Sequence, residues 1–132
     1  MKKSIFKFIL LPLYFVLFST QCEENIAPFT QEQEAQELSL LRQTIEDLAS
    51  QSICNESTAC NYIAFGSKPC GGPWSYLVYS NSINTEELIS MVEDYNQKEA
   101  LYNTTWGISS DCTIVNLPTS VKCENNTCIA VY

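Results

Sequence analysis

Seven cysteines constrain the fold of this 132-residue chain more than any other feature. They are Cys22, Cys54, Cys60, Cys70, Cys112, Cys123 and Cys128. In an oxidising compartment cysteines pair as disulfides, which hold together small domains whose hydrophobic core is modest. An odd count leaves one cysteine to be explained. One of the seven cysteines is therefore expected to have a role other than an internal disulfide.

The first 21 residues have the pattern of a secretory signal peptide. Lys2 and Lys3 precede an apolar run over residues 5–18, and small polar residues follow it. The run is shorter than the roughly 20 residues of a spanning helix, and Pro12 interrupts it. A retained anchor helix is the less favoured alternative. We expect residues 1–21 to be removed after export.

Cys22 follows this segment directly, in a stretch that resembles the acylation site of bacterial lipoproteins, although Gln21 is larger than the usual preceding residue. Glu23 and Glu24 resemble the acidic start of lipoproteins from Bacteroidetes-like bacteria, some of which reach the outer surface. Assigning Cys22 to a lipid also leaves six cysteines, an even number. We expect a protein of the bacterial cell envelope, lipid-anchored at the outer membrane or cell surface or facing the periplasm.

The six later cysteines are expected to form three disulfides. Six cysteines allow 15 pairings, so the count alone does not determine the connectivity. We favour a bridge between Cys70 and Cys112, which would tie a Gly/Pro loop to a strand after the second helix. Cys54 and Cys60 would then pair with Cys123 and Cys128, either across the domain or each locally.

Charge and composition disfavour several classes of function. Residues 22–132 carry four basic and fifteen acidic residues, a net charge of −11, which disfavours nucleic acid and anionic lipid headgroups as partners. The chain has no histidine, which removes the commonest general base and metal ligand. Zinc-type cysteine spacing, a phosphate-binding loop and a nucleophile-elbow motif are also missing from the sequence. We expect no enzyme activity, no cofactor, no metal and no nucleic-acid partner.

Two helices are predicted. After a tether over residues 22–30, a helix over about 31–52 begins with a capping box at Thr30 and Gln33. Its apolar stripe starts at Leu38, so its first two turns are expected to lie in water. A second helix begins at the N-cap Asn84 and ends near Gly107. Its apolar stripe, interrupted at Glu99, is expected to pack in the core: Leu88, Val92, Tyr95, Tyr102 and Trp106.

Short β-type runs occupy residues 61–65, 74–79, 120–123 and 127–132, and the last two are predicted to form a hairpin. A helical turn starting at Pro73 is an alternative for the second run. Residues 31–132 are therefore expected to form one α+β domain, with two helices packed on a small antiparallel sheet and stabilised by disulfides.

The segment Lys68-Pro69-Cys70-Gly71-Gly72-Pro73-Trp74, with Ser110-Asp111-Cys112 and Val121-x-Cys123-x4-Cys128, resembles a group of small exported bacterial proteins. The resemblance covers about residues 54–128. It implies export and three disulfides. That group has no established activity to carry over to this chain.

The favoured function is a non-catalytic domain that binds a protein partner of unknown identity. The candidate binding loop is Gly66–Trp74, where three glycines and two prolines in residues 66–73 predict an exposed turn. Its candidate binding residues are Lys68, Pro69, Gly71, Gly72 and Trp74. The alternative function is a peptidase inhibitor that presents Lys68. A plain structural turn, with Trp74 packed inward and Lys68 solvated, is a further alternative.

Lipidation of Cys22 is directly testable. A fatty-acid analogue supplied to the producing cells should label the wild-type protein and leave Cys22→Ser unlabelled, because only the thiol at this position can accept the acylglycerol. Gel fluorescence after coupling of the analogue measures the incorporation. Equal labelling of the two proteins would contradict the assignment.

Overall fold

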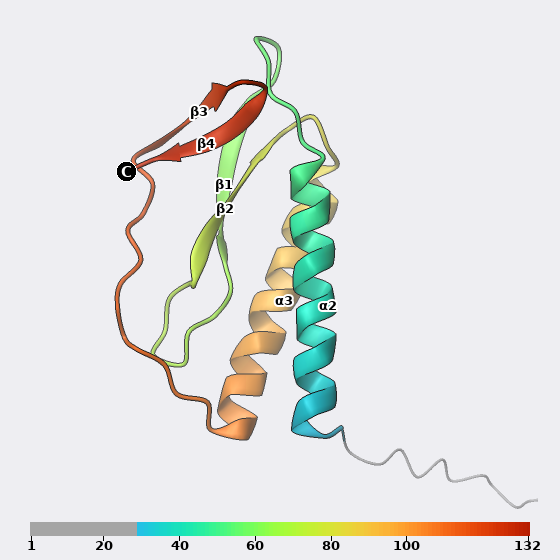
Figure 1. Ribbon diagram of the computed structural model, residues 1–132, viewed down its shortest axis with the longest axis vertical. Coiled ribbons are helices and arrows are strands. Elements are labelled where there is room, and N and C mark those ends of the chain that lie inside the picture. The colour runs from blue at the N-terminus through green and yellow to red at the C-terminus, as the bar shows by residue number, and fades with distance from the viewer. Residues whose placement is uncertain (1–28) are drawn as a thin grey trace, which may run out of the picture.

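Figure 1 shows the computed structural model, which describes residues 29–132. The expected signal peptide over residues 1–21 and the expected lipidation site Cys22 lie outside the described residues. The order of elements is α2 (Gln31–Ser50), β1 (Cys60–Phe65), β2 (Ser75–Ser80), α3 (Thr85–Trp106), β3 (Ser120–Glu124) and β4 (Thr127–Val131). The expected disulfide-stabilised α+β class is confirmed.

The elements lie in three layers (Figure 1). Helices α2 and α3 run side by side in opposite directions, the β1–β2 hairpin lies against them, and the β3–β4 hairpin lies beyond β1–β2. The strands form two separate antiparallel sheets of two strands each, where a single sheet was expected. The second hairpin packs on the first instead of extending its edge, because Cys60 on the β1 face turned away from the helices is bonded to Cys128 of β4.

Helix α2 begins with the expected capping box, in which the Thr30 backbone N–H donates to the Gln33 side chain over 2.9 Å. The expectation that its first two turns are surrounded by water is wrong at Glu34. This residue is half-buried, and its carboxylate accepts a 2.7 Å hydrogen bond from Trp106 Nε1. The antiparallel arrangement explains the contact, since it brings the end of α3 against the start of α2 (Figure 1).

Helix α3 is capped as the sequence predicts. Asn84 accepts a hydrogen bond from the Glu87 backbone, and Gly107 ends the helix in the left-handed conformation at φ 60°. The first part of the predicted stripe is buried, whereas Tyr102 and Trp106 are only half-buried beside the start of α2. Neither helix among the described residues combines the length and the apolar character needed to cross a membrane.

The hydrophobic core lies between the two helices and one face of the β1–β2 hairpin. Ile63 pairs with Leu77 across the hairpin, and both pack toward the helices with the buried Phe65 and Tyr79. Alternate residues of a strand point to opposite faces, so Tyr62 and Tyr76 lie on the other face, where their rings meet edge to face. The buried residues of this core form one small cluster: Ile45, Ala49, Phe65, Tyr79, Leu88, Val92 and Tyr95.

The strand expected around Cys112 does not form. Residues 108–118 have no regular secondary structure, and neither sheet extends to them. A strand needs a neighbour for its backbone hydrogen bonds. This segment instead runs along the outside of the molecule from α3 to β3 (Figure 1).

Three disulfides link segments that are distant in the sequence. They join Cys54 to Cys123, Cys60 to Cys128 and Cys70 to Cys112, with sequence separations of 69, 68 and 42. The favoured Cys70–Cys112 pairing is confirmed, and the other two bridges run across the domain. Closing loops of this length stabilises a fold by about 4 kcal/mol per bridge in the chain-entropy account, without additivity.

The core residue Leu88 is fully buried, whereas Leu101 of the same helix is 67% exposed. Leu88→Ala should lower the free energy of unfolding by about 2–5 kcal/mol, because it removes packed methyl groups and leaves a cavity. Leu101→Ala, the matched control, should change it by less than about 0.5 kcal/mol. Denaturant titration with the disulfides intact measures both values, and equal losses would contradict this assignment of the core.

Candidate functional site

The loop Gly66–Trp74 is a tight turn held by its own backbone. Trp74 donates to the Phe65 carbonyl, Lys68 to the Gly72 carbonyl over 2.8 Å, and Gly71 to the Lys68 carbonyl over 2.8 Å. At Gly66, where φ is 83°, an added Cβ would lie 2.6 Å from the Trp74 ring. Only the tip, residues 70–72, is exposed. The loop is therefore a rigid connection with a small accessible surface.

The Lys68 side chain lies inside the structure, which contradicts its expected exposure. The residue is 8% exposed, its Nζ donates a 2.7 Å hydrogen bond to the Thr113 carbonyl, and it lies 3.6 Å from Asp111 Oδ1. The Trp74 ring also covers the ammonium group at 5.0 Å. Lys68 is buried because residues 111–113 pass over it, held in place by the Cys70–Cys112 bridge. It is neither an accessible recognition residue nor a solvated one.

Three polar residues of α3 hold the start of this loop, and the sequence reasoning missed them. Asn96 accepts from the Gly66 backbone and donates to the Ala64 carbonyl, Glu99 accepts from the Ser67 backbone, and Asn103 donates to the Ser67 carbonyl. Their spacing of three and four residues places them on one face of the helix. The signal available in the sequence was the interruption of the apolar stripe at Glu99, which marks a polar stripe on the same helix.

Glu99 and Asp111, the two carboxylates next to this loop, are occupied by structural contacts. Glu99 also accepts a 3.0 Å hydrogen bond from the hydroxyl of Tyr95, whereas Asp111 lies against Lys68. Burial, followed by the negative charge of Glu99, raises the pKa of Tyr95 to about 12. Tyr95 therefore keeps its proton at neutral pH and acts as a donor. The two carboxylates serve different parts of the loop and do not form a pair.

An open groove lies between α2 and α3, at the end where residue 29 enters the structure. It has a volume of about 340 Å³ and a floor of apolar side chains, while Glu34, Glu37 and Lys98 add charge to its lining. Two of its apolar residues are strongly exposed, Phe29 at 50% and Leu101 at 67%. The apolar residues of the groove are Phe29, Leu38, Leu41, Leu101 and Tyr102.

The negative charge is concentrated on the helices that form this groove. Helices α2 and α3 each carry five acidic residues and one basic residue. The other described residues carry three acidic and two basic residues, so they are close to neutral. The helix layer therefore combines an apolar groove with an acidic surface, and the two hairpins do not share this combination.

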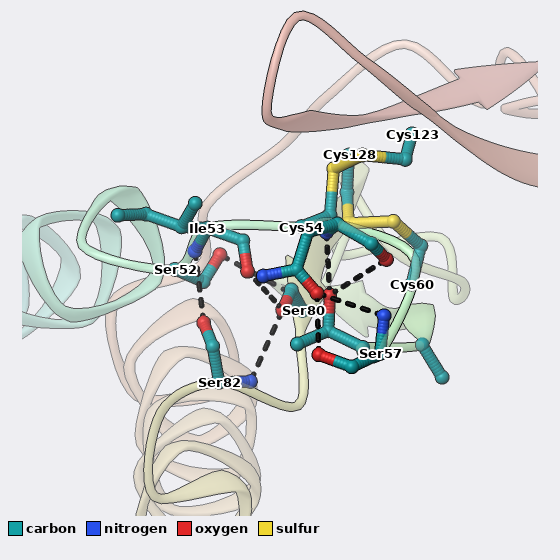
Figure 2. The surroundings of a disulfide bond; sticks show 12 residues. Ser52, Ile53, Cys54, Ser57, Cys60, Ser80, Ser82, Cys123 and Cys128 are labelled. Carbon is teal, nitrogen blue, oxygen red and sulfur yellow. Dashed lines mark hydrogen bonds between the residues drawn. A yellow bond between two sulfur atoms is a disulfide. The ribbon is translucent and has the colours of Figure 1, made fainter.

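The two cross-domain disulfides lie next to each other at the junction of the hairpins (Figure 2). The sulfur atoms of Cys54, Cys60 and Cys128 all lie within 4.8 Å of one another. Sulfur clusters of this size can hold zinc only as thiolates, and here all three atoms are in disulfides. Below them, the buried Ser80 hydroxyl donates to the Ile53 carbonyl over 2.8 Å and joins the end of β2 to the chain after α2.

Comparisons of the chain with protein families, with curated proteins and with solved structures found no match. The resemblance carried by the motif Lys68–Pro73 therefore remains an expectation.

The burial of Lys68 predicts a structural role. Lys68→Ala should lower the free energy of unfolding by about 1–3 kcal/mol, because the partly enclosed Thr113 carbonyl loses its donor. Lys122→Ala is the matched control, since Lys122 has a 56% exposed side chain paired with the exposed Glu124. It should change the free energy by less than about 0.5 kcal/mol. Denaturant titration of both variants distinguishes the roles, and an unchanged Lys68→Ala protein would show that the ammonium is dispensable.

Proposed function

We propose that this protein is a non-catalytic binding domain, exported and anchored in the bacterial cell envelope through a lipid on Cys22. The groove between α2 and α3 is the proposed binding surface. The observation that carries this proposal is the pair of apolar side chains, Phe29 and Leu101, that remain half or more exposed beside the groove. Exposed apolar surface of this kind is typical of sites that bind another molecule.

The proposed occupant is a helical segment of a partner protein with one apolar face and basic flanking residues. A groove between two helices accommodates such a helix, whose apolar side chains recur every three or four residues. The acidic surface of α2 and α3 complements basic flanks and increases the association rate with them. A second copy of this chain is a poorer occupant, because two acidic helix layers would repel each other.

The position of the groove supports a partner close to the membrane. Phe29, which lines the groove, is seven residues after Cys22. A chain extends by at most about 3.6 Å per residue, so the groove lies within about 25 Å of the proposed anchor. The segment that binds is therefore expected near the membrane surface of an envelope protein.

The alternative role, peptidase inhibition by the loop Gly66–Trp74, has less support. A disulfide and three backbone hydrogen bonds make the loop rigid, which lowers the entropic cost of binding. Its basic side chain is buried, however, so an inhibitor would have to use the exposed tip at residues 70–72. The exposed groove remains the preferred surface.

Site-specific photo-crosslinking in the producing cells tests the proposal. A photoreactive amino acid at position 101, in the groove, should crosslink to a partner segment that is basic and amphipathic. The matched control places it at position 114, because Ile114 is also apolar and 89% exposed but lies outside the groove. Mass spectrometry identifies the crosslinked peptide.

Three further outcomes are decisive for the binding surface. Glu37→Lys should reduce the crosslinking yield at position 101, because it places a positive charge opposite the basic flank of the partner. Crosslinks confined to residues 23–28 of the same chain would show that the chain fills its own groove. Equal yields of the same product from positions 101 and 114 would also contradict the proposal.

A further inference from the structure

The adjacent disulfides Cys54–Cys123 and Cys60–Cys128 are close enough to exchange sulfur partners. Figure 2 shows the two bridges side by side, and three of their four sulfur atoms lie within 4.8 Å of one another. The third bridge, Cys70–Cys112, is not part of this group. Exchange needs a sulfur within reach of a neighbouring disulfide, and only the first two bridges meet this condition among the described residues.

An alternative pairing of the same four cysteines fits the backbone. Cys123 and Cys128 are directly opposite each other in the β3–β4 register, so their side chains point to the same face. Opposite residues of antiparallel strands have Cα atoms about 4.5–5.5 Å apart, which lies within the range that a disulfide spans. The sulfurs of Cys54 and Cys60, the other two partners, are already neighbours.

We propose that these four cysteines form a thiol-exchange site, in which an external thiol converts the two cross-domain bridges into Cys54–Cys60 and Cys123–Cys128. Attack is expected at Cys123, which is exposed, whereas Cys54 is fully buried. Access to the attacked sulfur is one of the factors that set the rate of exchange. This activity is independent of the groove and of the function proposed for it.

The exchange balances in three steps. The external thiolate bonds to the Cys123 sulfur and releases Cys54 as a thiolate. Cys54 then bonds to the Cys60 sulfur, which breaks Cys60–Cys128 and releases the Cys128 thiolate. Cys128 finally attacks Cys123 in the mixed disulfide, forms Cys123–Cys128 and releases the external thiolate. Two disulfides are present before and after, so no net oxidation occurs and the thiol acts as a catalyst.

The structure favours this path over dissociation of the hairpin. The Cys54 backbone N–H donates a 3.0 Å hydrogen bond to the Asn126 carbonyl in the β3–β4 turn. This bond keeps Cys54 beside the hairpin after its own bridge opens. After rearrangement, no disulfide fastens β3–β4 directly to β1 or to the chain after α2, while Cys70–Cys112 remains as a distant tether. The exchange therefore converts a fastened hairpin into one that can separate from the β1–β2 face bearing Tyr62 and Tyr76.

Disulfide mapping of the mature protein tests the exchange. The protein is incubated in a buffer of reduced and oxidised glutathione, quenched with acid, alkylated and cleaved without reduction. Cleavage after Glu56, Phe65, Lys98, Lys122 and Glu124 places each of the six cysteines in its own peptide. The expected result is accumulation of Cys54–Cys60 and Cys123–Cys128 peptides, while the Cys70–Cys112 linkage remains as the internal control.

Hydrogen exchange provides a second measurement on the same samples. The backbone amides of β3 and β4 should exchange faster in the rearranged form, while those of α2 and α3 keep their protection. Recovery of the original linkages alone under all glutathione ratios would overturn the proposal. Scrambling that includes Cys70 or Cys112 would also overturn it, because it would indicate general unfolding and not exchange at one site.

Discussion

The fold depends on the two disulfides that fasten the C-terminal hairpin to the rest of the domain. The buried core consists of a few side chains between the helices and one face of the β1–β2 hairpin. The β3–β4 hairpin adds no buried residue to that core, and most of its side chains are exposed. Small domains with limited apolar burial commonly rely on disulfides for stability. Cys54 and Cys60 supply this constraint, since they hold a segment that hydrophobic packing would hold only weakly.

A buried polar network also holds irregular segments in place in the middle of the molecule. The stripe on α3 satisfies the backbone of the loop that follows β1, and Lys68 satisfies a carbonyl of the irregular segment after α3. Among residues 29–132, no buried side-chain nitrogen or oxygen lacks a partner. Full satisfaction matters because an unpaired buried polar group is costly. Lys68 and Glu99 thus stabilise the loop Gly66–Trp74. Because these side chains are used inside the structure, the loop has little exposed surface with which to recognise a partner.

The α2–α3 groove lies in the helix layer, away from the two cross-domain disulfides at the hairpins. The α2–α3 groove combines exposed apolar side chains with most of the negative charge of the described domain, and the chain enters beside it at Phe29. A partner would therefore approach the helices, while thiol exchange would act on the hairpins. The β1–β2 hairpin separates these two regions (Figure 1), so the two proposed activities do not compete for the same residues.

The sequence by itself determined the features that depend on neighbouring residues. Both helices, their caps at Thr30, Asn84 and Gly107, and the C-terminal hairpin follow from local hydrogen bonding and from the spacing of apolar side chains. The tertiary structure decided which cysteines meet, that the strands form two sheets, and that Lys68 is buried under residues 111–113. It also created the groove, because the exposure of Leu101 depends on how the start of α2 meets the end of α3. These properties involve residues tens of positions apart, and one sequence contains no local signal for the distance between them.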